Sequence, residues 1–148
     1  MAETVSLIKV LNVRENEKKV AQKAYLKSQD AFEEVATKLY NVLKKKEQAE
    51  ASYDNYIQTT SSLERIKEQI AYIEKLNTQI IHLQREVQFA RDQMDKKQVV
   101  LNEAYIEVKK FENIIENRRK NAAEKTKKME KSFMDEISIN QYLSHKNR

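Results

Sequence analysis

The chain has 148 residues, of which 40% are hydrophobic and 34% charged, and it contains no Gly, Pro, Cys or Trp. Glycine and proline form most tight turns, so a chain of this length without them has little room for several hairpins or βα loops. The composition favours a few very long helices, and its apolar content argues against disorder. The lack of cysteine excludes thiolate nucleophiles, disulfides and thiolate metal sites.

The first third of the chain carries an apolar row at alternating spacings of four and three residues. Eleven of its fifteen members are apolar or aromatic: Leu7, Leu11, Arg14, Lys18, Ala21, Tyr25, Ser28, Phe32, Val35, Leu39, Val42, Lys46, Ala49, Tyr53 and Tyr56. This heptad period predicts one helix over about residues 5–57 with an apolar seam. Arg14 and Lys18 interrupt the seam, either for function or by laying their stems along it while their charges stay in water.

The row ends at a cluster of hydroxyl residues, Thr59 to Ser62, which favours a helix end over a helix interior. Ser61 and Glu64 have the spacing of a capping box, which marks the start of a helix. We therefore predict a turn at about residues 58–61 and a second helix over about residues 62–142.

The second helix carries a more regular seam. Every seventh residue is apolar over ten positions: Ile66, Ile73, Ile80, Val87, Met94, Leu101, Val108, Ile115, Ala122 and Met129. The accompanying row is apolar except at Lys97: Leu76, Leu83, Ala90, Lys97, Ala104 and Phe111. Two helices with such seams, joined by a short turn, pack as an antiparallel coiled-coil hairpin of the all-α class.

The second helix is longer than the first, so it is expected to extend beyond its partner from about residue 116. Six apolar positions then have nothing in their own chain to cover them: Met129, Phe133, Ile137, Ile139, Tyr142 and Leu143. Exposed apolar rows on a helix usually bind another protein. This overhang is the first indication of function.

The positive charge is concentrated where the second helix leaves the hairpin. Residues 109–131 include nine basic and four acidic side chains, a net charge of +5, which equals that of the whole chain. This charge would suit an acidic partner surface, although a solvated face is an equally good interpretation. Nucleic acid is weakly supported, because the window has no aromatic stacking platform and no recognisable nucleic-acid module.

No catalytic constellation can be found in the sequence. His82 and His145 are the only histidines, and without glycine there is no phosphate-binding loop. Carboxylates on a two-helix structure face water, so we expect no enzyme, cofactor or metal site. No segment approaches the roughly 20 apolar residues that span a bilayer, and the N-terminus lacks a signal layout, which predicts a cytoplasmic protein.

Four short motifs resemble the FliJ family of the bacterial flagellar type III export apparatus, in the form typical of Bacillus. They are the LIKVLNVRENE segment at residues 7–17, YIEKL at 72–76 followed by Ile80, EVKKFE at 107–112 and DEISI at 135–139. Each is short, but their order, their spacing and the total length together cover nearly the whole chain.

The resemblance implies a non-catalytic stalk, similar to the central stalk of rotary ATP synthases, in the cytoplasm and peripheral at the cytoplasmic face of the membrane. Its implied partners are the export ATPase FliI, the export gate protein FlhA and export chaperones. The candidate ATPase contacts are Leu7, Leu11, Arg14, Lys18, Ile115, Arg118 and Arg119. The candidate gate contacts are Tyr72 and Leu76, although from the residues alone Tyr72 also fits a solvent-flanking aromatic and Leu76 a seam position.

Two other functions remain open from the sequence. A structural or scaffolding coiled coil would use its seam to dimerise, whereas an intramolecular hairpin would be mainly monomeric. A basic helical protein could instead bind anionic membranes, and salt would abolish that binding. Because the helices lack an apolar face for insertion, this is the weakest of the three functions considered, after the export component and the scaffold.

Overall fold

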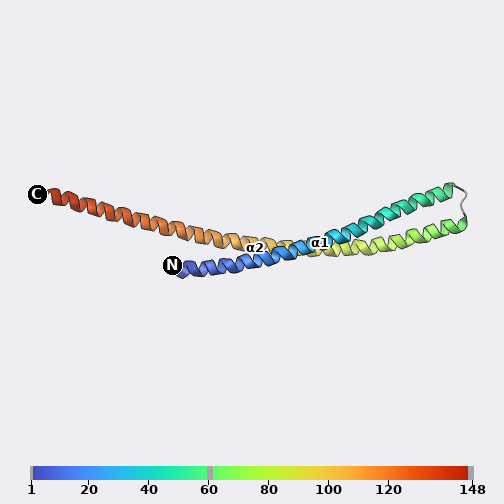
Figure 1. The fold of residues 1–148 in the computed structure, drawn as a ribbon, viewed down its shortest axis with the longest axis horizontal. Coiled ribbons are helices and arrows are strands. Elements are labelled where there is room, and N and C mark those ends of the chain that lie inside the picture. The colour runs from blue at the N-terminus through green and yellow to red at the C-terminus, as the bar shows by residue number, and fades with distance from the viewer. Residues whose placement is uncertain (1, 60–61, 147–148) are drawn as a thin grey trace. The chain divides into compact units, whose positions relative to one another are not determined.

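The computed structural model describes residues 2–59 and 62–146, which form two α-helices, α1 (Ala2–Gln58) and α2 (Leu63–Lys146). The helices run in opposite directions from the turn that joins them (Figure 1). The prediction of an all-α antiparallel hairpin with a longer second helix is therefore confirmed. α1 begins at residue 2, whereas the sequence predicted about residue 5, and α2 continues to residue 146, beyond the predicted 142.

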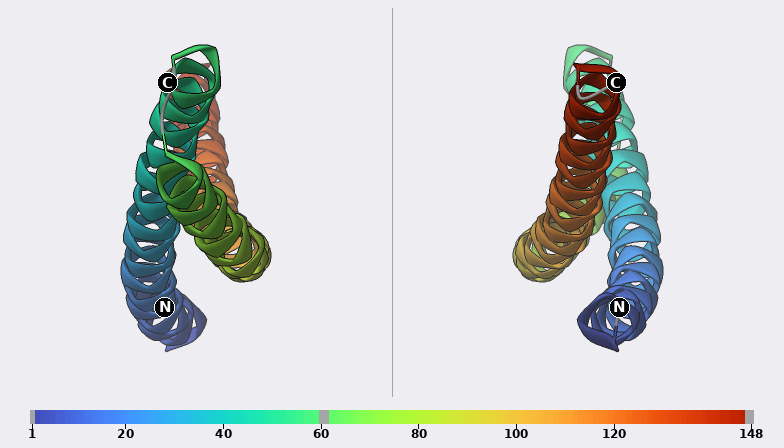
Figure 2. Two further views of the ribbon diagram at one scale, coloured as in Figure 1. Left: turned by 90° about the vertical axis from the view of Figure 1, so that its right-hand side faces the viewer. Right: turned by 90° about the vertical axis from the view of Figure 1, so that its left-hand side faces the viewer.

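The hairpin consists of two compact units, to which both helices contribute. Unit 2 comprises residues 19–103 and includes the turn, and Figures 1 and 2 show the end of α1 and the start of α2 beside one another there. Unit 1 comprises residues 1–18 of the first segment and 104–148 of the second. Each unit has its own buried side chains.

The predicted rows form the contact between the helices. All fifteen positions of the α1 row are buried or half-buried. On α2 the ten-member row is at least half-buried from Ile66 to Ile115, and Lys97 is the one exposed member of the accompanying row. The most buried side chains of unit 2 are Ala21, Ala49, Leu76, Ile80 and Ala90, and those of unit 1 are Val108 and Ile115. Three of these seven are alanines, whose small side chains let two helices approach closely.

The turn is defined by hydrogen bonds on both sides. Thr59 donates from its backbone N–H and from its hydroxyl to the carbonyl oxygen of Asn55, at 3.0 and 2.8 Å, which extends the end of α1. At the start of α2, the Ser62 hydroxyl oxygen accepts from the Arg65 N–H at 3.4 Å, in the position of an N-cap. The predicted capping box of Ser61 and Glu64 depends on Ser61, which lies outside the described residues.

One polar side chain joins the helices of unit 2 inside the seam. The Gln69 side-chain amide donates to the backbone carbonyl oxygen of Ala49 at 2.9 Å, and Ala49 is itself buried. Gln69 lies seven residues before Leu76 and so belongs to the same row of the heptad. A small residue opposite it leaves its backbone accessible, and the amide is thereby satisfied in a half-buried place.

We expect Leu76→Ala to lower the free energy of unfolding by about 2–5 kcal/mol, because Leu76 is only 3% exposed and its truncation leaves a cavity. Leu43→Ala is the matched control, since Leu43 lies in the same unit but is 42% exposed. Chemical denaturation followed by circular dichroism measures both. Equal losses for the two variants would contradict the assigned seam.

Candidate partner-binding surfaces

The apolar candidates for the ATPase contact hold the two helices of unit 1 together. Ile115 is buried, while Leu7 and Leu11 are half-buried in the α1 row. Most of the surface of these side chains is therefore used inside the hairpin.

Two of the three basic residues of the α1 row, Arg14 and Lys18, lie over aromatic rings of α2. The Arg14 guanidinium carbon is 5.9 Å from the centre of the Phe111 ring, and Lys18 Nζ is 4.9 Å from the centre of the Tyr105 ring. Lys109 Nζ lies over the same Tyr105 ring at 5.6 Å. Cations above ring faces are attracted by the negative face of the ring, by about 0.5–1 kcal/mol at exposed sites.

Arg14 is fixed by more than the ring. Its terminal nitrogen donates to both carboxylate oxygens of Glu17, at 3.0 and 3.2 Å. Its Nε is enclosed and has no hydrogen-bond partner within the described chain. At Arg14 and Lys18 the aliphatic part of the side chain thus lies along the seam while the charge lies over an aromatic ring. Sequence reasoning missed Tyr105, since it lies outside the two apolar rows and only the register of the hairpin brings it to Lys18.

Arg118 and Arg119 lie where α2 extends past α1. The Arg118 guanidinium donates to the Glu3 carboxylate at 2.9 Å, which joins residues 115 positions apart. Both side chains of this pair are largely exposed, so the ion pair adds little stability. Arg119 is exposed. These two arginines are therefore accessible to a partner, whereas the apolar candidates are mostly covered.

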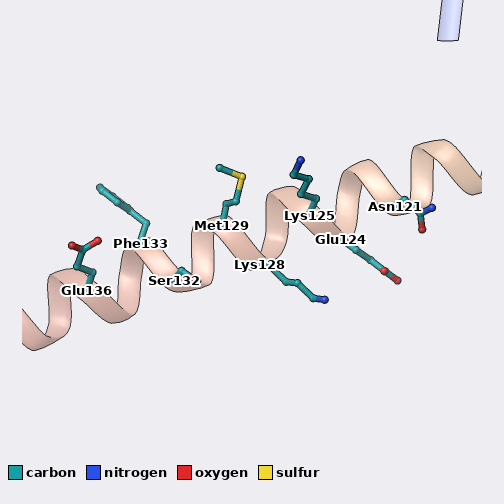
Figure 3. Close-up of a pocket in the computed structure, with 8 residues that line it drawn as sticks. All are labelled: Asn121, Glu124, Lys125, Lys128, Met129, Ser132, Phe133 and Glu136. Carbon is teal, nitrogen blue, oxygen red and sulfur yellow. The ribbon is translucent and has the colours of Figure 1, made fainter. Parts of the chain in front are cut away.

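The overhang of α2 is uncovered, as predicted. From residue 116 to residue 146 every side chain is exposed except the half-buried Ile137. The row that is buried at Ile115 thus becomes exposed at Ala122 and Met129. Figure 3 shows Met129 and Phe133 projecting into open space from one side of this helix. Met134 is a further exposed apolar side chain that the sequence reasoning did not single out.

The two candidate gate residues are in different environments. Tyr72 is 43% exposed, and the exposed Ile70 lies two residues before it. Leu76 is almost completely buried in the seam of unit 2. A partner could contact Tyr72 while the hairpin stays closed, but reaching the Leu76 side chain would require the helices to separate.

Unit 2 also has an apolar groove on its side, which the sequence did not indicate. Its lining comprises Ser28, Ala31, Val35, His82, Arg85, Glu86, Phe89, Ala90 and Gln93. Two of these lining residues form a pair, with His82 Nε2 3.0 Å from a Glu86 carboxylate oxygen, and both side chains are well exposed. Within residues 2–59 and 62–146 no three His, Asp or Glu side chains gather in a way that could hold a metal ion. In the same residues, neither helix has a stretch apolar enough to cross a membrane.

Fold and surfaces together define a two-helix coiled-coil protein with a basic, uncovered helix end. The family model described as "Flagellar FliJ protein" matches residues 3–147. The flagellar FliJ protein of Bacillus subtilis (strain 168) is 37% identical over 135 residues, which cover 91% of this chain and 92% of that protein. No solved structure matches. The chain belongs to the flagellar FliJ protein family, which confirms the resemblance seen in the sequence.

A double-mutant cycle tests the contact between Lys18 and Tyr105. We expect Lys18→Ala and Tyr105→Ala to be coupled by about 0.5–1 kcal/mol in the free energy of unfolding, because each variant alone removes the same cation–ring contact. Lys9→Ala paired with Tyr105→Ala is the control, since Lys9 is exposed in the same unit. Coupling in the control but not in the first cycle would contradict the assignment.

Proposed function

We propose that this protein is a stalk-like component of the flagellar type III export apparatus, which binds the export ATPase ring and couples it to the export gate and to export chaperones. Membership of the flagellar FliJ family carries this proposal. The protein contributes surfaces and performs no chemistry. It acts in the cytoplasm and, when assembled, at the cytoplasmic face of the membrane.

The ATPase contact is assigned to the end of unit 1. There, Leu7, Leu11 and Ile115 hold α1 against α2. The accessible charge comes from Arg118 and Arg119, which lie within the window of net charge +5. An acidic lining of the ring would attract this end over about a Debye length, roughly 10 Å at 0.1 M salt. Arg14 and Lys18 support the contact by their charge while they remain on their aromatic rings.

The gate contact is assigned to Tyr72 in unit 2. Its partly exposed ring offers an apolar face with a polar hydroxyl, a combination that is common at protein interfaces. Leu76 supports this contact from the seam, four residues or one helical turn further along α2. A Leu76 variant would also disturb the packing of the hairpin, so loss of gate binding in that variant would not by itself identify Leu76 as a contact.

Binding to a FliI-type ATPase tests the first assignment. We expect the wild-type protein to co-purify with the ATPase in low salt and to raise its hydrolysis rate or promote its hexamer. Arg118→Glu together with Arg119→Glu should weaken binding by about tenfold or more, since two favourable charges become unfavourable. The measurements are pull-down and steady-state ATP hydrolysis at two salt concentrations.

The matched control for that experiment is Lys44→Glu with Lys45→Glu. These two lysines are also adjacent and exposed, but they lie in unit 2, and the change in net charge is the same. Glu3→Ala controls for the loss of the ion pair to Arg118. Wild-type protein that neither binds nor stimulates the ATPase in low salt would refute the assignment, as would equal losses for both charge-reversed proteins.

Gate binding is tested by Tyr72→Ala against Tyr40→Ala. Tyr40 lies on α1 in the same unit and is also exposed, so both variants remove a surface ring. We expect Tyr72→Ala to reduce binding to the cytoplasmic part of an FlhA-type gate protein by about tenfold, as for an interface aromatic. Tyr40→Ala should bind like the wild type in the same titration. If Tyr40→Ala weakened binding and Tyr72→Ala did not, the gate contact would lie on α1 instead of α2.

A further inference from the structure

Four side chains of the overhang form a surface with a definite order of charge. Figure 3 shows Lys125, Met129, Phe133 and Glu136 projecting from one side of α2, with Asn121, Glu124 and Lys128 on the other. Their spacings of four, four and three residues keep them on one helix face. We call these four residues the overhang face. Along the helix it reads basic, apolar, apolar and acidic.

The apolar centre of this face is uncovered. Met129 is 65% exposed and Phe133 is 62% exposed, and they are neighbours one helical turn apart. Met129 continues the row that is buried at Ile115, so the same face is covered in the hairpin and bare in the overhang. Uncovered apolar surface of this kind is expected to bind a partner, and the charges on either side restrict which partner fits.

Two copies of the overhang face are complementary in charge when their helices lie antiparallel. A two-fold axis at about residue 131 would place Met129 of one copy opposite Phe133 of the other. Lys125 lies six residues before that point and Glu136 five residues after it. The mismatch is one residue, or about 1.5 Å along the helix, which a lysine stem can span. Each Lys125 would then face the Glu136 of the other copy.

We propose that the overhang face binds a second copy of this chain in antiparallel orientation. The contact is isologous, so every pair occurs twice: two Met129–Phe133 pairs and two Lys125–Glu136 pairs. Methionine sulfur against an aromatic ring adds to the apolar burial. In a parallel pair in register, Lys125 would meet Lys125 and Glu136 would meet Glu136, so like charges disfavour that arrangement.

The contact is short, and this sets its strength. Four residues from each copy form its centre, and Ala122 and Asn140 extend it on either side. Such an interface is smaller than the roughly 1,200–2,000 Å² buried in stable complexes, so the dimer forms reversibly and at high concentration. It leaves the hairpin seam intact, which distinguishes it from a coiled coil that dimerises through its seam. It also does not depend on the proposed export function.

Sedimentation equilibrium of the full chain from about 10 to about 300 μM tests the proposal. We expect the weight-average mass to rise with concentration from 17.5 kDa toward twice that value. Lys125→Glu and Glu136→Lys should each weaken association by about fivefold or more, because each places like charges opposite one another. The double variant with both exchanges should associate within about twofold of the wild type, since the complementary pair is restored.

The matched control exchanges two charges that lie off the face, Lys127→Glu with Asp135→Lys, and it should leave association unchanged. Phe133→Ala should abolish association while circular dichroism shows the helix intact. A wild-type chain that stays monomeric at every concentration would overturn the proposal. A double variant that associates as weakly as the single variants would overturn it too. A dimer that is insensitive to all these changes would point to the seam instead, which also overturns it.

Discussion

The packing of apolar seams between the two helices, within each unit, is the constraint on which the rest of this protein depends. Without glycine or proline the chain has few means of making a compact core, so its apolar side chains are buried along a line between two helices. The most buried positions are small or aliphatic, such as Ala49, Leu76 and Val108. Surface ion pairs such as Lys38–Glu34 are exposed and contribute little by comparison.

Three polar residues of the seams have particular partners on the other helix. Gln69 donates to the backbone of Ala49, while Arg14 and Lys18 lie over Phe111 and Tyr105. These contacts work only at one axial alignment of the two helices, so they favour a single register. An apolar residue at each place would lack these register-specific partners.

The buried seam ends at Ile115, whereas α2 continues to Lys146. The part of α2 that packs the hairpin therefore differs from the part that is left exposed. Up to Ile115 the heptad row is used for packing, and beyond it the same row is exposed beside a concentration of basic side chains. The arginines of the proposed ATPase contact and the overhang face both lie on this part of α2, which the hairpin does not need for packing. The proposed gate residue Tyr72 lies instead on the hairpin itself.

The sequence by itself determined the helical class, the two seams, the turn region and the uncovered end, because a heptad row records which side chains must be buried on a helix. It also indicated the family through four motifs in order. What it did not determine were contacts between residues far apart in the chain, such as Arg118 with Glu3 and Lys18 with Tyr105. Periodicity fixes the face of a residue, whereas these pairs depend on the axial register between the helices. That register was decided only when the turn and the seam brought the two helices together.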